Sequence, residues 1–147
     1  MRALLAMGLV LIFPFCVHAQ TAEQTVLQMM IGTKKYETMK VTRLDECRFR
    51  VEGVRSTPTG EFAVINFSKM KDYVPSRLPS GVTLIRMTGD REFVLWRLRD
   101  PKLGDGQFSE SYVADYEYDV SATETAALSI QELTAAEAHF RQQYCKR

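Results

Sequence analysis

The middle of the chain, from Tyr36 to Val120, is a succession of short segments rich in β-branched and aromatic residues, with turn-forming residues between them. Short connections between such segments favour antiparallel pairing, in which one sheet face is buried and the other is wet. We expect six strands, at residues 36–43, 47–54, 61–68, 82–87, 92–99 and 109–120. This pattern restricts the chain to a fold built around an antiparallel sheet.

The turn residues predict how these strands connect. The loop from Ser56 to Gly60 predicts a hairpin between the second and third strands, and Gly89-Asp90 predicts a tighter hairpin between the fourth and fifth. Residues 72–81 hold two prolines, at positions 75 and 79, and we expect a stiff connection outside the sheet. Arg77 and Leu78 lie at its centre and form a candidate contact surface, although a plain connector is the favoured interpretation.

A helix is expected at each end of this sheet. Thr21 with Gln24, and Ser129 with Glu132, have the spacing of a capping box, in which side chains bind the free amides of a helix start. The first helix should cover residues 22–31, and the second should bury one face. The expected fold class is therefore α+β: a meander-like antiparallel sheet of about five to six strands, flanked by an N-terminal and a C-terminal helix.

The first 19 residues have the three parts of a secretory signal peptide. A positive charge at Arg2 precedes an apolar run at residues 3–13, and Val17-His18-Ala19 places small residues where signal peptidase cleaves. We expect cleavage before Gln20 and a single exported domain at residues 20–147 that is periplasmic or secreted. A retained membrane anchor is the alternative, but the apolar run is shorter than the roughly 20 residues that span a bilayer.

Cleavage would leave two of the three cysteines, Cys47 and Cys145. Two cysteines in an oxidising compartment predict one disulfide, which would join the last helix to the second strand. Two buried free thiols are the alternative.

The charge distribution favours some partners over others. The formal net charge is only +1, which gives no reason to expect nucleic acid. Residues 34–99 contain 14 Lys and Arg against 8 Asp and Glu, whereas residues 100–147 contain 4 against 9. These halves either pair with each other or present a basic patch to an acidic partner. For such a partner we single out Arg48 and Arg50, which alternate with Phe49 and Val51 and should point outward together.

The densest cluster of polar aromatic residues lies in the last expected strand. There Tyr112, Tyr116 and Tyr118 would share one face, with acidic residues on the other. The tyrosines are a candidate aromatic strip for a partner. The alternative is that they cover the edge of the core while the acids pair with Arg97 and Arg99 on the preceding strand.

No catalytic set is assembled in the sequence. His139 is the only histidine after residue 19, so three or four zinc ligands are not available, and no cofactor motif occurs. We expect neither metal nor cofactor. The leading hypothesis is a non-catalytic module that binds another extracytoplasmic protein, such as an envelope or secretion accessory factor or an inhibitor or immunity protein. A carrier of a small apolar ligand and a hydrolase that uses carboxylates are the other hypotheses.

Overall fold

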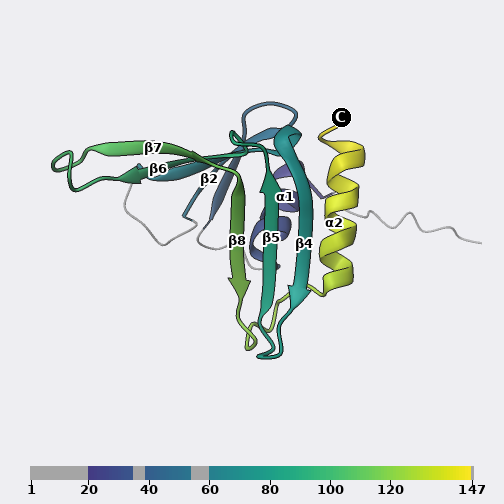
Figure 1. The fold of residues 1–147 in the computed structure, drawn as a ribbon. Coiled ribbons are helices and arrows are strands. Elements are labelled where there is room, and N and C mark those ends of the chain that lie inside the picture. The colour runs from purple at the N-terminus through teal and green to yellow at the C-terminus, as the bar shows by residue number, and fades with distance from the viewer. Residues whose placement is uncertain (1–19, 35–38, 54–59, 147) are drawn as a thin grey trace, which may run out of the picture.

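A computed structural model describes residues 20–34, 39–53 and 60–146. The expected signal peptide and most of the loop at residues 56–60 lie outside these ranges. The described residues form two helices, a short 3-10 turn and eight strands, which divide between two antiparallel sheets (Figure 1). The predicted α+β class, with a helix near each end, is confirmed.

The larger sheet contains five strands and the smaller contains three. The larger has the order β1 (Lys40–Arg43), β2 (Arg48–Glu52), β3 (Phe62–Asn66), β6 (Val94–Arg99) and β7 (Phe108–Val113). The smaller has the order β4 (Met70–Arg77), β5 (Thr83–Gly89) and β8 (Asp115–Val120), and the turn η1 (Phe67–Lys69) leads into it. The hairpin predicted between the second and third strands is confirmed as the pairing of β2 with β3.

The hairpin predicted at Gly89-Asp90 is wrong, because the chain changes sheets there. β5 pairs with β4 and β8, while β6 pairs with β3 and β7. A Cβ atom on Gly89 would lie 2.6 Å from the carbonyl oxygen of Lys69 and 2.6 Å from Cγ of Phe93. The lack of a side chain at Gly89 therefore allows close packing where the chain crosses between the sheets.

The long strand expected at residues 109–120 is also divided between the sheets. It is interrupted at Ala114, with β7 on one side and β8 on the other. The carbonyl of Ala114 accepts a hydrogen bond from the Gly89 amide at 2.7 Å. Two of the three places where the chain passes from sheet to sheet are therefore side by side.

The segment at residues 72–81, expected as a connection outside the sheet, forms most of the strand β4 and the turn after it. Pro75 lies within β4, directly opposite Ile85. An edge strand tolerates proline, because the amide that proline lacks can be one that faces away from the neighbouring strand. Pro79 lies in the turn that follows β4. In this turn the Leu78 amide donates a hydrogen bond to the Val82 carbonyl at 2.8 Å.

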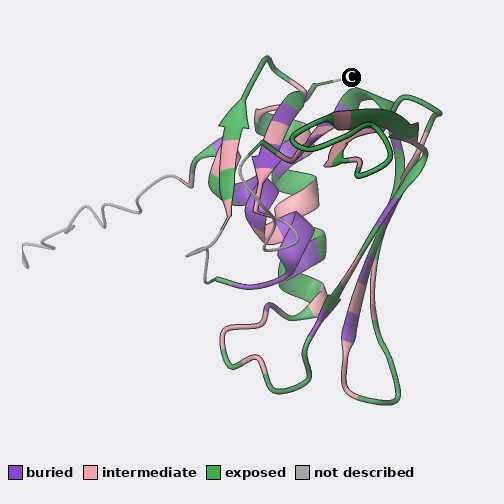
Figure 2. Ribbon diagram, turned by 90° about the vertical axis from the view of Figure 1, so that its left-hand side faces the viewer, coloured by how far each residue is buried: buried purple, intermediate pink, exposed green. Residues whose placement is uncertain are grey.

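Both helices, α1 (Ala22–Ile31) and α2 (Ile130–Gln143), begin with the predicted capping boxes. The Gln24 amide donates to Oγ1 of Thr21 at 3.2 Å, and the Glu132 amide donates to Oγ of Ser129 at 3.1 Å. Helix α1 contacts β1, β5, β8 and α2, while α2 covers β4 (Figure 1). Buried residues accordingly concentrate on α1 and on the strand faces around it (Figure 2).

Three phenylalanines from separate parts of the chain meet in the core. The ring of Phe140 on α2 lies 4.8 Å from that of Phe67 and 5.6 Å from that of Phe49, and all three side chains are buried. Next to this cluster, Cys47 and Cys145 form the predicted disulfide, with Cα atoms 4.9 Å apart and a separation of 98 positions in the sequence. The bond joins the residue before β2 to the end of α2.

Candidate functional site: a hollow on the outer face of the five-stranded sheet

The outer face of the five-stranded sheet is partly polar and partly apolar. On β2 the predicted alternation is confirmed: Phe49 and Val51 are fully buried, while Arg48 is exposed and Arg50 half-buried on the opposite face. On β3 both faces are apolar, and Val64 lies on the outer one, directly opposite Arg50. The outer face therefore contains hydrophobic groups between its charges.

The strand register aligns side chains from four strands in one row across this face. Arg50 lies opposite Val64, Val64 opposite Leu95, and Leu95 opposite Tyr112. Three members of this row line a hollow of about 310 Å³. It is lined by Leu44, Arg48, Val64, Asn66, Glu92, Leu95 and Tyr112. Tyr112 is 58% exposed and Leu44 is 48% exposed, so two large apolar groups face solvent here.

The charged groups of the hollow differ in how they are held. Arg48 forms an ion pair with Asp45, whose Oδ2 lies 2.5 Å from the arginine Nε. The amides of Cys47 and Arg48 also donate to Oδ1 of Asp45, at 2.9 and 2.8 Å. The Arg48 side chain and then the Cys47 amide hold the pKa of Asp45 below its usual value. Glu92 forms no ion pair with any residue that the structure describes.

The Arg50 side chain already contacts other residues of this chain. Its guanidinium lies 4.0 Å from the ring centre of Phe62, and its Nη2 lies 2.7 Å from Oε1 of Glu52. Arg97 lies 4.6 Å from the ring centre of Phe108 in the same way. Arg50 therefore has fewer free donors for an acidic partner than its position in the sequence suggested.

The other predicted contact residues do not join this hollow. Arg77 ends β4 and Leu78 follows it, so both belong to the three-stranded sheet, and Leu78 is 38% exposed. Tyr116 is buried and its hydroxyl donates to the Met30 carbonyl at 3.3 Å. Tyr118 is half-buried against the core. The expected tyrosine strip does not form, because the break at Ala114 puts Tyr112 on a different sheet.

The charged halves of the chain pair in part, through other pairs than those expected. Arg97 lies 3.7 Å from Glu110 on β7, and Arg86 lies 2.5 Å from Glu117 on β8. The predicted pairing of Arg97 and Arg99 with the acids of β8 is wrong, since β8 is in the other sheet. Such exposed pairs contribute about 0–1 kcal/mol each.

Sequence reasoning missed most of the hollow's apolar residues. Leu44 lies in a turn, and Leu95 lies on the face of β6 opposite the half-buried Trp96. A signal was present at residues 62–67, where both faces are apolar. That pattern indicated a central strand, which β3 is, but it also marks apolar groups on the outer face.

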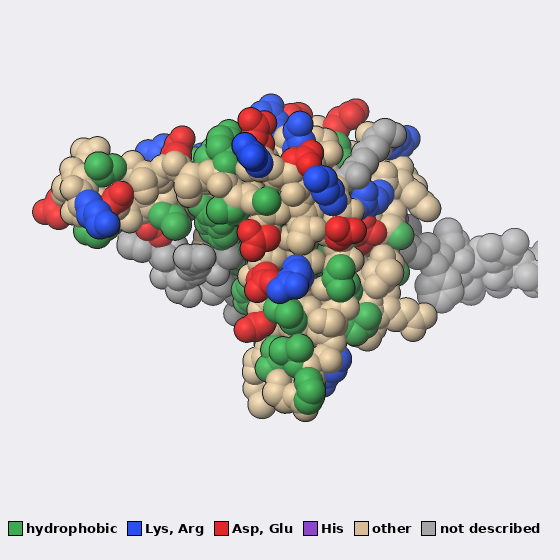
Figure 3. Space-filling model, in the orientation of Figure 1, with side chains coloured by type: hydrophobic (Ala, Val, Ile, Leu, Met, Phe, Trp, Pro, Cys, Tyr) green, Lys and Arg blue, Asp and Glu red, His purple; other side chains and the backbone are tan. Residues whose placement is uncertain are grey.

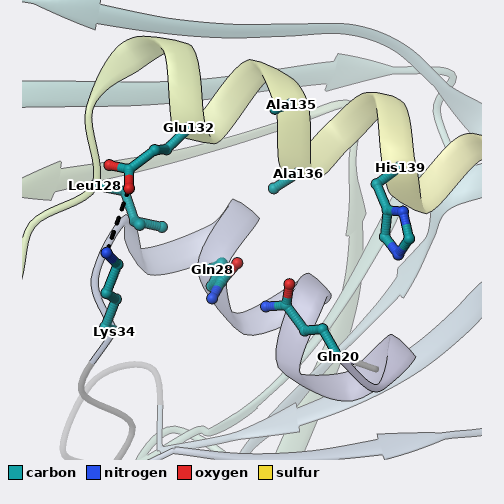
Figure 4. A pocket seen from close by; sticks show the side chains of 8 residues that line it. All are labelled: Gln20, Gln28, Lys34, Leu128, Glu132, Ala135, Ala136 and His139. Atoms are coloured by element: carbon teal, nitrogen blue, oxygen red, sulfur yellow. Dashed lines mark hydrogen bonds and ion pairs between the residues drawn. The ribbon is translucent and has the colours of Figure 1, made fainter. Parts of the chain in front are cut away.

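A second hollow, also of about 310 Å³, lies between α1 and α2 (Figure 4). Its lining includes Gln20, Gln28 and the exposed His139, and at one end Nζ of Lys34 lies 3.3 Å from Oε1 of Glu132. The Ser129 amide and then Lys34 lower the pKa of Glu132. Its apolar lining comes from Leu128, Ala135 and Ala136, and no large aromatic residue is among the residues that line it.

In residues 20–34, 39–53 and 60–146, no three His, Cys, Asp or Glu side chains are grouped so that they could hold a metal ion. No helix within the same residues has the length and hydrophobicity to cross a membrane.

Compared with known protein families, curated proteins and solved structures, the chain matches none.

Proposed function

We propose that this protein is an exported, non-catalytic module that binds another extracytoplasmic protein through the hollow on the five-stranded sheet. The observation that carries the proposal is the exposure of Tyr112 and Leu44 around an apolar floor. Interfaces concentrate their binding energy in such aromatic groups, with charged groups at the rim. An envelope or secretion accessory factor, or an inhibitor or immunity protein, would use a surface of this kind.

A carrier of a small apolar ligand is less well supported. Such a carrier needs an enclosed apolar cavity between its layers. Here the space between α2 and the sheets is filled by the rings of Phe49, Phe67 and Phe140. We therefore place the binding function on the surface.

Export is expected to remove residues 1–19, and the mass of the purified mature protein tests this directly. A mass that begins at Gln20, from protein recovered outside the cytoplasm, is the expected result. The disulfide supports this proposal, because such bonds persist in oxidising compartments. A mass that retains the first 19 residues would contradict it.

The binding surface is tested by replacing Tyr112 with alanine. We expect Tyr112→Ala to retain the melting temperature of the wild type but to lose most partner capture from the envelope fraction of the native host. Truncating a central aromatic residue commonly costs about 2 kcal/mol or more of binding free energy.

Val74→Ala is the matched control, because Val74 is 51% exposed on β4 of the other sheet. It should capture the same proteins as the wild type. Equal capture by the wild type and both variants would show that the hollow does not bind the partner.

A further inference from the structure

The fold has four free strand edges, and they differ in how they are protected. An unpaired edge attracts other strands, so proteins usually protect edges with short strands, charges, prolines or bulges. In the described part of the chain, β1 and β7 end the larger sheet, while β4 and β8 end the smaller one. Comparing the four shows which edge is open to a partner.

Three of the four edges are protected. β1 has only four residues and includes Lys40. β4 contains Pro75 and a register shift between Met70 and Asp72. On β8 three exposed acids alternate, and acidic side chains follow this strand in Figure 3. Another copy of β8 would place like charges opposite each other, which opposes pairing.

β7 has the fewest of these protections. Its pairing with β6 is continuous from Phe108 to Val113, without a shift, and it contains neither proline nor lysine. Its one charge is Glu110, between Phe108 and Tyr112 on the outer face. With β6 it forms an arm that projects from the body of the molecule (Figure 1). The edge of this arm is therefore the open one.

We propose that β7 binds its partner by strand addition: an extended segment of the partner protein pairs with β7 as a sixth strand of the larger sheet. This inference rests on the proposed function and specifies how the partner binds. Main-chain hydrogen bonds would give affinity, and alternate side chains would give specificity. Tyr112 belongs both to this edge and to the hollow, so the added segment would continue onto the proposed surface.

The side chains of β7 define the chemistry of that segment. Residues opposite each other on paired strands have Cβ atoms about 4.5–5.5 Å apart. The residue opposite Glu110 should therefore be Lys or Arg, and the residues two positions to either side should be apolar, to cover Phe108 and Tyr112. Glu110 already lies 3.7 Å from Arg97 on β6, but its side chain is 53% exposed, so the carboxylate can also bind a cation on its other side.

A second copy of this chain does not fit the edge as well. Two β7 strands paired across a two-fold axis place one residue opposite its own copy, since antiparallel registers must then be symmetric. In the registers centred on residues 109, 110 and 111, Glu110 meets Phe108, another Glu110 or Tyr112. None of these is a cation, so a basic segment of a different protein is the better match.

The test uses a blocked peptide of sequence Ser-Val-Thr-Lys-Thr-Val-Ser, which reads the same in both directions and so suits either strand orientation. We expect it to bind the full mature protein and to bind Glu110→Lys about tenfold more weakly, as attraction turns to repulsion. A peptide with Glu in place of Lys should show the opposite preference. Asp119→Lys makes the same charge change on β8 and should bind like the wild type.

Two N-methylated peptides test the main-chain hydrogen bonds. One is methylated at its second, fourth and sixth residues, and the other at its third and fifth. Alternate residues of a strand face the same edge, so only one of the two peptides should lose binding. On binding of the unmethylated peptide, amide exchange should slow in β7 and not in β8.

Each remaining outcome contradicts strand addition. These outcomes are no binding at millimolar peptide, equal effects of both methylation patterns, an unchanged affinity in Glu110→Lys, or a dimer of the free protein in sedimentation that Glu110→Lys disrupts. If Tyr112→Ala still abolishes capture of the native partner, the binding surface stands and only the strand addition fails.

Discussion

Replacing Cys47 and Cys145 together with alanine should lower the free energy of unfolding by about 2–5 kcal/mol. The disulfide links positions 98 residues apart, so it restricts nearly the whole unfolded chain. Cys145 is also buried, and its removal takes sulfur out of the core. Urea unfolding followed by circular dichroism would measure the change.

The single variants provide the control for this prediction. Cys47→Ala and Cys145→Ala each break the same bond, so each should lose nearly as much stability as the double variant. Reduction of the wild type should give a similar loss. Two titratable thiols in the oxidised, denatured protein, or a loss below about 1 kcal/mol, would refute the structural role of the bond.

Replacing Phe140 with alanine should destabilise the fold by about 3–5 kcal/mol. Its side chain is fully buried and contacts the rings of Phe49 and Phe67, so truncation leaves a cavity where α2 meets the larger sheet. Thermal and urea unfolding would both report the loss.

Phe108→Ala is the matched control, because Phe108 is half-buried on the arm and contacts Arg97 there. It should cost about 1 kcal/mol or less. Equal losses in the two variants would mean that the phenylalanine cluster does not fix α2 to the larger sheet.

Local signals in the sequence predicted the helices, most strands and the disulfide. A capping box and the spacing of apolar residues act within a few positions, and both lie entirely in the printed sequence. The disulfide followed from the count of cysteines together with the expected export. These features depend little on which strands finally pair.

The division into two sheets could not be predicted, because it depends on contacts between distant residues. Gly89 has the properties of a hairpin turn, but its packing against Lys69 and Phe93 decides where the chain goes next. Ala114 carries no signal of a break, since its role is to accept one hydrogen bond from Gly89. Pro75 argued against a strand and was compatible with one only at an edge.

Only part of the hollow could be predicted from the sequence, for the same reason. Arg48 and Tyr112 were candidates, each for its own local pattern, but their closeness arises from the register of β2, β3, β6 and β7. Leu95 and Val64 complete the floor because they share that row. The sequence predicts which residues share a face of one strand. Which residues lie in a row across several strands depends on how the strands pair.

The position of the disulfide also determines what proteolysis can do to this molecule. The bond encloses every loop between Cys47 and Cys145, including the exposed turn at residues 100–107 that ends the arm. A peptide bond cut in any of these loops leaves both pieces covalently joined, so no fragment can diffuse away. A molecule with such an arm can thus be cut once in its exposed turn and remain one particle.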